Sequence, residues 1–336
     1  TWSYVFEDGG FRSVDLGSPG SLQSLVDGYK AAGIKLADVS SVIVTHGHSD
    51  HDGTVPEFLD MSGAELWAHE TYGILKSFNA WDIQDFGASA LQVELRRIGK
   101  ERIALDHIEA RLNRDHAYYE GRKSTEVSVH ITDGYEFGDL SAFSTPGHSP
   151  DQICLKIDDV LFTGDHVLPE ITPHPTSKMV LKKKFQEMFS PKIIDSSRLY
   201  GLGVYLKSLA RMLAFRGEVT VLPAHRLYNR GQYNCIGVDR AGDIMDHHKR
   251  RLTRLLQAVT RGESNLEDIT EGIFSRSKLL GVNLMAAISE VVAHLEFLEE
   301  TEDILVTEDG HISRVGPESP NYISSIENFR KAELWS

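Results

Sequence analysis

The chain has 336 residues, of which 41% are hydrophobic and 25% charged, so it can bury one large core and a smaller one, and a disordered or fibrous protein is excluded. Its formal net charge of −14 at pH 7 opposes a polyanion across most of the surface. A nucleic-acid partner would therefore need a local basic patch.

Neither membrane insertion nor export is expected. The longest uncharged apolar stretch, 279–289, is far shorter than the ~20 residues that a membrane span needs. The sequence does not open on a basic segment followed by an apolar one. Its two cysteines, Cys154 and Cys235, are too few for a disulfide framework and lack the paired spacing of a thiolate zinc site. We therefore expect a cytoplasmic protein.

The first 240 residues alternate short apolar runs with helical patterns, which predicts an α/β domain. Residues 2–17 predict a hairpin around an Asp-Gly-Gly turn. Residues 21–33 predict a helix that Ser21 caps and Gly33 ends. A second, short helix is expected within 55–63. Further strands are predicted over 41–45, 64–69, 127–131, 140–145, 152–157, 160–164 and 219–223.

Two long stretches interrupt these strands. Residues 70–125 are charged and mostly helical, with aromatic residues spaced through them, and we expect an insertion that serves as a lid or an oligomer contact. Residues 168–215 contain no predicted strand and end in a helical pattern over 205–215.

The composition changes after residue 240, and the pattern of the remaining residues predicts a separate domain over 241–336. Three helical segments are followed by an alternating stretch around an Asp-Gly turn, which is typical of a hairpin. Three helices and a two-stranded wing indicate a small winged-helix-like C-terminal domain. The segments are 243–259, 265–274, 283–300 and the hairpin 303–315.

A dense group of metal-binding residue types follows the strand predicted at 41–45. His46, His48, Asp50 and His51 form the pattern H-x-H-x-D-H. Neutral imidazole nitrogens and carboxylate oxygens both bind zinc and related divalent ions, and a tight loop can bring them together. Because a buried strand leads into this loop, a metal site is favoured over a solvated turn.

Similar residues follow three other predicted strands. His148 lies in TPGHS, Asp165 in FTGDH and His225 in VLPAH. Singly, each would be ordinary for a surface or capping residue. Since all three occupy the same position relative to a strand, we expect them to complete the metal site.

The motifs THGHSDHDG, TPGHS, FTGDH and VLPAH, in this order, resemble the metallo-β-lactamase superfamily and its glyoxalase II-like core. The resemblance covers about residues 1–240. It implies a four-layer αβ/βα sandwich with a binuclear metal site along one edge of two sheets. By that resemblance the first metal is held by His46, His48 and His148, the second by Asp50, His51 and His225, and Asp165 bridges both.

Two divalent metal ions imply hydrolytic chemistry. They lower the pKa of bound water and polarise a carbonyl, so a metal-bound hydroxide attacks and no side-chain nucleophile is needed. Asp50 is the predicted catalytic residue, which orients the hydroxide and passes its proton to the leaving group. We expect zinc, with iron or manganese as alternatives.

The expected partner is a small-molecule acyl substrate, with a thioester favoured. Downstream lysines could bind its phosphates or carboxylate, although a solvated helix face explains them as well. They are Lys178, Lys182, Lys183, Lys184 and Lys192. A homodimer formed through the C-terminal domain is a further expectation.

Two other functions remain open. A metallo-β-lactamase domain followed by a winged helix is similar to a branch with single-stranded endoribonucleases, but the acidic segment 296–303 would repel phosphate. Relatives that carry a single iron oxidise sulfur compounds, but the complete ligand set favours two metals.

Several neighbouring residues have weaker predictions. Thr45 and Asp15 are expected to support the ligands through hydrogen bonds. Gly47 and Gly53 are expected to let the loop turn tightly, although Gly53 could equally start a helix. His166 and His174 could face the substrate, but a structural role within the loop 165–175 is favoured. The pair at 247–248 is interpreted as part of a solvated helix face.

Overall fold

The computed structural model describes residues 1–78, 80–102, 118–187, 195–215, 219–275, 279–280 and 282–331. The chain falls into two compact units. The first is Thr1–Asp82, Arg111–Pro173 and Phe215–Arg240, and the second is Ile83–Ala110, His174–Ala214 and Ala241–Ser336. One boundary lies at residue 240, where the sequence predicts it, but two earlier segments group with the C-terminal residues. The division into domains 1–240 and 241–336 stays a prediction.

The first sheet of the first unit has the order β1-β2-β3-β4-β5. Only β1 and β2 pair antiparallel, as the predicted hairpin requires, and the other neighbours are parallel. Five of the six residues of β3 are buried, as expected of a central parallel strand that is covered on both faces. The strands are Tyr4–Glu7 (β1), Phe11–Val14 (β2), Val39–Val44 (β3), Glu65–His69 (β4) and Val129–Ile131 (β5).

The second sheet has the order β10-β9-β8-β7-β6. Its strands β10 and β9 are parallel, and the remaining pairs are antiparallel. The edge strand β6 was not predicted, because none of its three residues is buried and no apolar run marks it. The strands are Tyr135–Phe137 (β6), Leu140–Ser144 (β7), Ile153–Ile157 (β8), Val160–Gly164 (β9) and Thr220–Pro223 (β10).

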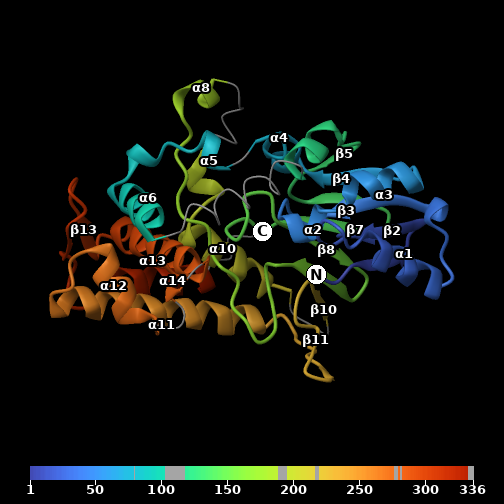
Figure 1. Ribbon diagram of the computed structural model, residues 1–336. Coiled ribbons are helices and arrows are strands. Elements are labelled where there is room, and N and C mark those ends of the chain that lie inside the picture. The colour runs from blue at the N-terminus through green and yellow to red at the C-terminus, as the bar shows by residue number, and fades with distance from the viewer. Residues whose placement is uncertain are drawn as a thin grey trace. The chain divides into compact units, whose positions relative to one another are not determined.

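The core of the first unit lies between the two sheets and beneath the helices on the first sheet (Figure 1). Ile43 and Trp67 of the first sheet pack with Leu155 and Phe162 of the second. On the other face of the first sheet, the helices α1 (Leu22–Ala31) and α3 (Val55–Ser62) cover a second apolar cluster. This layered α/β arrangement confirms the predicted fold class.

Helix α1 begins and ends as predicted, but Ser21 does not cap it. The Ser21 hydroxyl donates to the carbonyl of Ser18, and its side chain accepts no hydrogen bond from the helix. Gly33 follows the helix with a φ of 75°, a conformation that favours glycine.

The rest of the first unit consists of short elements. The predicted insertion at 70–125 is helical where it is described, and residues 103–117 lie outside the described part, so its role stays a prediction. The elements are η1 (Leu36–Asp38), α2 (Ser49–Asp52), α4 (Glu70–Leu75), most of α5 (Ala80–Ile83), a helical segment at 118–124, β11 (Tyr228–Asn229) and β12 (Gln232–Tyr233).

The second unit is mostly helical. The three C-terminal helices and the hairpin lie where they were predicted, and α14 is an additional helix. The winged-helix assignment itself stays a prediction. The elements are η2 (Phe86–Ala88), α6 (Ala90–Arg102), α8 (Lys183–Gln186), η3 (Ser196–Arg198), α10 (Leu202–Met212), α11 (Arg240–Arg261), α12 (Leu266–Ile273), α13 (Val282–Glu300), β13 (Ile304–Val306), β14 (Ile312–Arg314) and α14 (Asn321–Lys331).

The prediction of a solvated face at 247–248 is wrong for His248. This side chain is fully buried, and its Nδ1 lies 3.0 Å from Nε2 of the buried His294 on α13. The pairing of α11 with α13 therefore buries a polar pair, which the spacing of residues along one helix does not reveal. Among the described residues, no helix has the length and apolar character needed to cross a membrane.

Candidate metal centre

The candidate site lies where β3 of the first sheet meets the second sheet. The carbonyl of Thr45, directly after β3, accepts a hydrogen bond of 2.9 Å from the backbone N–H of Ile153 at the start of β8. Ala224, after β10, donates to the carbonyl of Gly164 at the end of β9. The first bond joins the end of β3 to the second sheet, and the second joins the ends of β9 and β10 within that sheet, so the loops that follow these strands converge.

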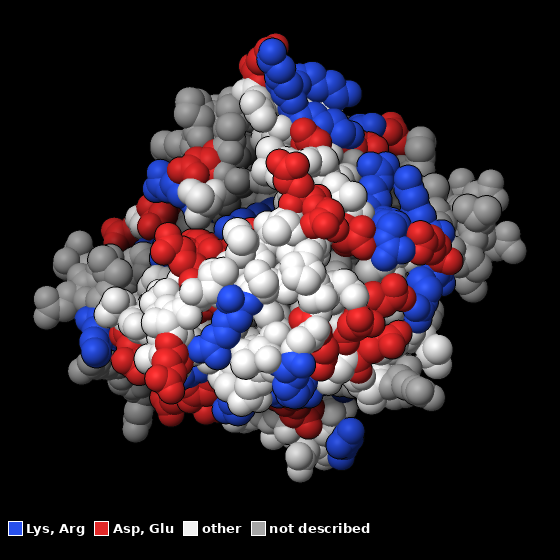
Figure 2. Space-filling view, turned by 90° about the vertical axis from the view of Figure 1, so that its left-hand side faces the viewer, with Lys and Arg blue, Asp and Glu red and all other residues white. Residues whose placement is uncertain are grey.

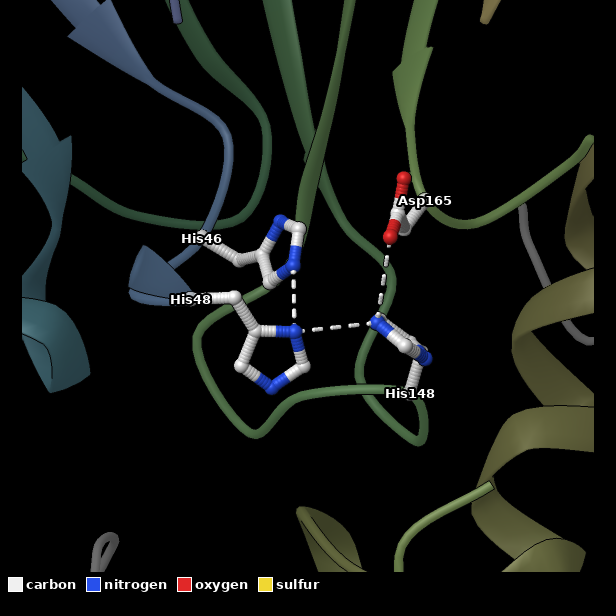
Figure 3. Close-up of side chains that lie close together, drawn as sticks. All are labelled: His46, His48, His148 and Asp165. Atoms are coloured by element: carbon white, nitrogen blue, oxygen red, sulfur yellow. Dashed lines mark hydrogen bonds and ion pairs between the residues drawn. The ribbon is translucent and has the colours of Figure 1, made fainter. Parts of the chain in front are cut away.

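The first group of candidate ligands consists of His46, His48, His148 and Asp165, whose ligand atoms lie within 4.8 Å of one another. Figure 3 shows the four side chains pointing toward a common centre. Nδ1 of His48 is 2.8 Å from Nε2 of His46 and 3.2 Å from Nε2 of His148, which is 3.6 Å from Oδ2 of Asp165. A tetrahedral zinc site spaces its ligand atoms by about 3.4 Å, so these distances fit one cation.

The second group consists of Asp50, His51 and His225, again within 4.8 Å. Nε2 of His225 lies 3.1 Å from Oδ2 of Asp50, and Nε2 of His51 lies 3.7 Å from the same oxygen. Oδ1 of Asp165 is 3.5 Å from His51 Nε2 and 3.2 Å from His225 Nε2. Asp165 thus presents one oxygen to each group, which is the arrangement expected of a bridging carboxylate.

Two atoms at the centre of the site lack the hydrogen bonds that buried polar atoms normally make. Nε2 of His51 and Oδ1 of Asp165 are buried, and neither has a hydrogen-bond partner among the described residues. Leaving such atoms unsatisfied costs free energy, and cations would remove that cost. The nitrogen and oxygen donors therefore fit two divalent cations.

The charge state of the imidazoles follows from their surroundings. Burial, together with the neighbouring His51 and His48, lowers the pKa of His46 well below its usual value, so this side chain is neutral. Burial also opposes protonation of His51, but Asp15 and Asp165 outweigh it and raise the pKa of His51 to about 10. A divalent cation would compete with that proton for Nε2.

The carboxylates are ionised at neutral pH. Burial favours the protonated form of Asp50, but the hydrogen bond to His225 and the charge of His51 hold its pKa well below the usual value. Burial also favours the protonated form of Asp165, but the neighbouring imidazoles of His225, His51 and His148 hold its pKa well below the usual value. Both side chains are therefore available as anionic ligands.

Asp15 and Thr45 make the hydrogen bonds that the sequence predicts. Asp15 has a φ of 53°, an uncommon conformation for a residue other than glycine. Its carboxylate accepts bonds of 2.8 Å from the backbone and the hydroxyl of Thr45, and it lies 2.8 Å from Nδ1 of His51. Thr45 Oγ1 is also 3.2 Å from Nδ1 of His46. Both imidazoles are thus held by Nδ1, which directs Nε2 into the site.

The two glycines of the loop are required by close contacts and not by their backbone angles. Neither Gly47 nor Gly53 has a positive φ. A Cβ on Gly53 would lie 2.2 Å from Pro19 Cδ, so a side chain does not fit there. Gly53 follows α2 and does not start α3, which begins at Val55.

The other predicted residues lie outside the two ligand groups. His166 is buried next to Asp165, and His174 Nε2 lies 3.0 Å from the carbonyl of Ala286 in the second unit, consistent with structural roles. Lys178 and the lysines at 182–184 also belong to the second unit, and Lys192 lies outside the described residues. Phosphate binding by these lysines stays a prediction.

Sequence analysis missed a second group of charged residues beneath the metal-binding loop. Asp52, Asp151 and Arg122 are all buried there. In the sequence, the one signal for this group was Asp52, an acidic residue between the candidate ligand His51 and Gly53. Arg122 comes from a distant helical segment, and no local pattern marks it.

The chain is similar to known proteins in sequence and in fold. Residues 3–225 match the sequence profile of the Metallo-beta-lactamase superfamily. A metallo-beta-lactamase fold-containing protein of Sulfurisphaera tokodaii is 26% identical over 165 residues, which are 46% of this chain and 58% of that protein. The match therefore spans less than two thirds of that relative.

Two solved structures share the fold over most of the chain. A metallo-beta-lactamase family protein from Thermus thermophilus has a TM-score of 0.58 at 20% identity, and 93% of each chain is covered. A beta-lactamase domain protein from Burkholderia ambifaria has a TM-score of 0.61 at 20% identity, covering 93% of this chain and 88% of the other. Similarity at this level of identity concerns the fold alone.

Proposed function

The chain belongs to the metallo-beta-lactamase superfamily, and we therefore propose that it is a binuclear metal-dependent hydrolase of a small acyl compound, with a thioester as the favoured substrate. The observation that carries the proposal is the convergence of seven side chains into two adjoining groups with Asp165 between them. A mononuclear site would not need the second group.

When bound, two divalent cations supply Lewis acidity toward a carbonyl oxygen and lower the pKa of water. The chain's own residues hold them and order the reactants. His46 and His51 are fully buried, whereas the side chains of Asp50 and His225 are 39% and 26% exposed. His48 is exposed as well, so the substrate approaches over His48, Asp50 and His225.

Asp50 is placed to handle the proton of the reaction. Its pKa lies well below the usual range, because the contact with His225 outweighs the effect of burial, so its carboxylate is ionised at neutral pH and available as an acceptor. Oδ2 already lies within 3.1 Å of His225 and 3.7 Å of His51. Asp50 then delivers the proton to the leaving group, which is the role of a general acid and base.

A cavity beside Asp50 supports a small, partly apolar acyl group. It measures about 360 Å³, and Thr1, one of its lining residues, donates a hydrogen bond of 3.0 Å from its hydroxyl to Oδ2 of Asp50. Apolar side chains form much of its lining, as in most small-molecule sites. They are Trp2, Tyr4, Val5, Leu16, Leu25 and Tyr29.

Single-stranded RNA is the second substrate that the test must include. On the face shown in Figure 2, acidic and basic side chains are interspersed around a central uncharged area, and the described residues visible there form no continuous basic stripe. The net charge of −14 supports a small substrate over a polyanion.

The proposal is tested by measuring the metal content of the purified protein and screening it against acyl-thioesters, lactones and single-stranded RNA. We expect two cations per chain and hydrolysis of a thioester. Asp50→Asn should keep the fold and lose at least ~100-fold in turnover, in line with the loss of a general acid or base. Asp133→Asn, which alters a carboxylate that accepts from the backbone of Ser144, serves as the control.

Two results would contradict the proposal. One iron per chain with oxidation of a sulfur compound would indicate the mononuclear reaction. Cleavage of RNA without any acyl hydrolysis would indicate the nuclease.

A further inference from the structure

A buried ion pair lies directly beneath the metal-binding loop. Nε of Arg122 is 3.0 Å from Oδ2 of Asp52, and both side chains are almost inaccessible to solvent. Tyr72 donates a hydrogen bond of 3.0 Å to the same oxygen, and Tyr118 donates to the other oxygen. The Asp52 carboxylate thus has partners for both oxygens, which a buried charge needs if it is to remain ionised.

Arg122 also contacts the turn between two candidate ligands. A Cβ on Gly47, which separates His46 from His48, would lie 2.6 Å from Nη2 of Arg122 and 3.0 Å from Oδ2 of Asp151. Asp151 accepts a hydrogen bond of 2.8 Å from the backbone N–H of Gly47. The loop backbone is therefore packed directly on the guanidinium group.

The orientation of the guanidinium group is fixed by aromatic rings. Its central carbon lies 5.2 Å from the ring centre of Tyr72, 4.9 Å from that of Tyr118 and 5.8 Å from that of Tyr119. A planar guanidinium stacks on such rings while its N–H groups reach carboxylates, which a lysine ammonium cannot do as well.

We propose that Arg122 is a positioning residue of the metal centre, through which the helical segment 118–124 sets the geometry of the loop that carries His46, His48, Asp50 and His51. The inference rests on the proposed function, because it requires that this loop bind cations. Under this proposal, the end of the predicted insertion at 70–125 helps to position the metal ligands.

Arg12 provides a matched control in the same unit. Its Nε lies 3.3 Å from Oδ2 of Asp8, and its guanidinium carbon lies 4.5 Å from the ring centres of Trp67 and Phe137. Like Arg122, it is about 5% exposed. None of these contacts involves the metal-binding loop, so Arg12 reports the cost of losing any buried, stacked arginine.

The experiment compares Arg122→Met with Arg12→Met in the full chain. The affinity for Zn²⁺ and Co²⁺ is measured by competition with a chelator, the visible spectrum of the Co²⁺ form is recorded, and thermal unfolding is followed after metal removal. Both variants should unfold at lower temperature. Arg122→Met alone should bind the cations ~10- to 100-fold more weakly, as expected when groups that orient metal ligands are lost, and should show an altered Co²⁺ spectrum.

If Arg122→Met does not fold, Tyr118→Phe provides a second test of the positioning role. This variant removes one hydrogen bond to Asp52 and leaves the ion pair in place. It should weaken cation binding in the same direction but by a smaller factor, with the metal-free protein still folded.

The outcomes separate this inference from the proposed function. If Arg122→Met binds the cations with wild-type affinity and shows the wild-type Co²⁺ spectrum, the positioning role is overturned. If only Tyr118→Phe folds, the same result in that variant overturns it. Equal losses in Arg12→Met would overturn it as well. A wild-type protein that binds two cations but hydrolyses no tested acyl compound would contradict the substrate proposal and leave the positioning role supported. A wild-type protein that binds no cation would overturn both.

Discussion

Replacing Asp15 by asparagine should weaken the metal centre without touching a candidate ligand. In the wild-type protein, Oδ2 of Asp15 lies 2.8 Å from Nδ1 of His51 and accepts the hydroxyl of Thr45, while Oδ1 accepts the backbone N–H of Thr45. In Asp15→Asn, Oδ1 can still accept from the backbone. An amide NH₂ then faces Nδ1 of His51.

The consequence for His51 is a change of tautomer. A carboxylate holds the proton on Nδ1, which leaves the lone pair of Nε2 for a cation. An amide donor at the same place favours the lone pair on Nδ1 and the proton on Nε2. That nitrogen is the one that lies 3.7 Å from Asp50 and 3.5 Å from Asp165 in the second ligand group.

The size of the effect follows from the energy of the lost contact. Groups that hold a metal-bound imidazole contribute 10- to 100-fold to metal affinity, which corresponds to about 1–3 kcal/mol. We expect the larger loss for the cation held by His51, because His51 contacts Asp15 directly, whereas His46 is linked to Asp15 only through the Thr45 hydroxyl. The other cation should lose less affinity.

The assay is a chelator competition that resolves two dissociation constants, with far-UV circular dichroism to verify the fold. Asp133→Asn is the control, since Asp133 accepts from the backbone N–H of Ser144 and belongs to neither ligand group. If both cations bind to Asp15→Asn as tightly as to the wild type, the tautomer argument is refuted. A uniform loss of both cations would show that Asp15 holds the whole loop and not His51 in particular.

Three further predictions concern the two ligand groups, the cavity and the second unit. His225→Ala and His148→Ala should each reduce the metal content from two cations to one, as measured by elemental analysis, and unchanged content in both would contradict the ligand assignment. Gly28 lines the cavity from α1, and a Cβ there meets no atom within 4 Å. Gly28→Leu should therefore raise KM for long acyl groups more than for acetyl. If the dependence of KM on acyl chain length is unaltered, the cavity does not bind the acyl group. Burial raises the pKa of Glu296 from 4.5 to about 7, despite the bonds it accepts from the backbone of Lys178 and from Gln92. The folded state therefore binds this proton more tightly than the unfolded chain, and the contribution of Glu296 to stability should fall by about 3 kcal/mol as pH rises from 4.5 to 7. Urea unfolding should show that Glu296→Gln lacks this fall, and an equal fall in both proteins would contradict it.

Much of the site was predictable from local sequence. The pattern H-x-H-x-D-H follows a run of β-branched residues, and the structure places it at the end of β3. His148, Asp165 and His225 follow β7, β9 and β10 in the same way. The reason is that a strand's period and its end are encoded within a few residues, so a pattern of this length shows which side chains reach the edge of a sheet.

Two predictions were wrong because each was made from the residue pattern of a single helix. The pair at 247–248 looks exposed when α11 is considered by itself, but α13 supplies the partner that allows His248 to be buried. Ser21 has the right residue type for a cap, yet its hydroxyl turns back to Ser18. In both cases a nearby polar group that the pattern does not contain determines where the side chain lies.

The sequence by itself determined which residue types could bind cations and at which strand ends they lie. Only the tertiary structure decided that they converge, that Asp165 offers one oxygen to each group, and that Arg122 lies beneath Gly47. The physical reason is the distance along the chain. Contacts between residues on different strands, or between Gly47 and Arg122, which are 75 positions apart, depend on how the sheets pack and in which register their strands pair, and no short pattern contains that information.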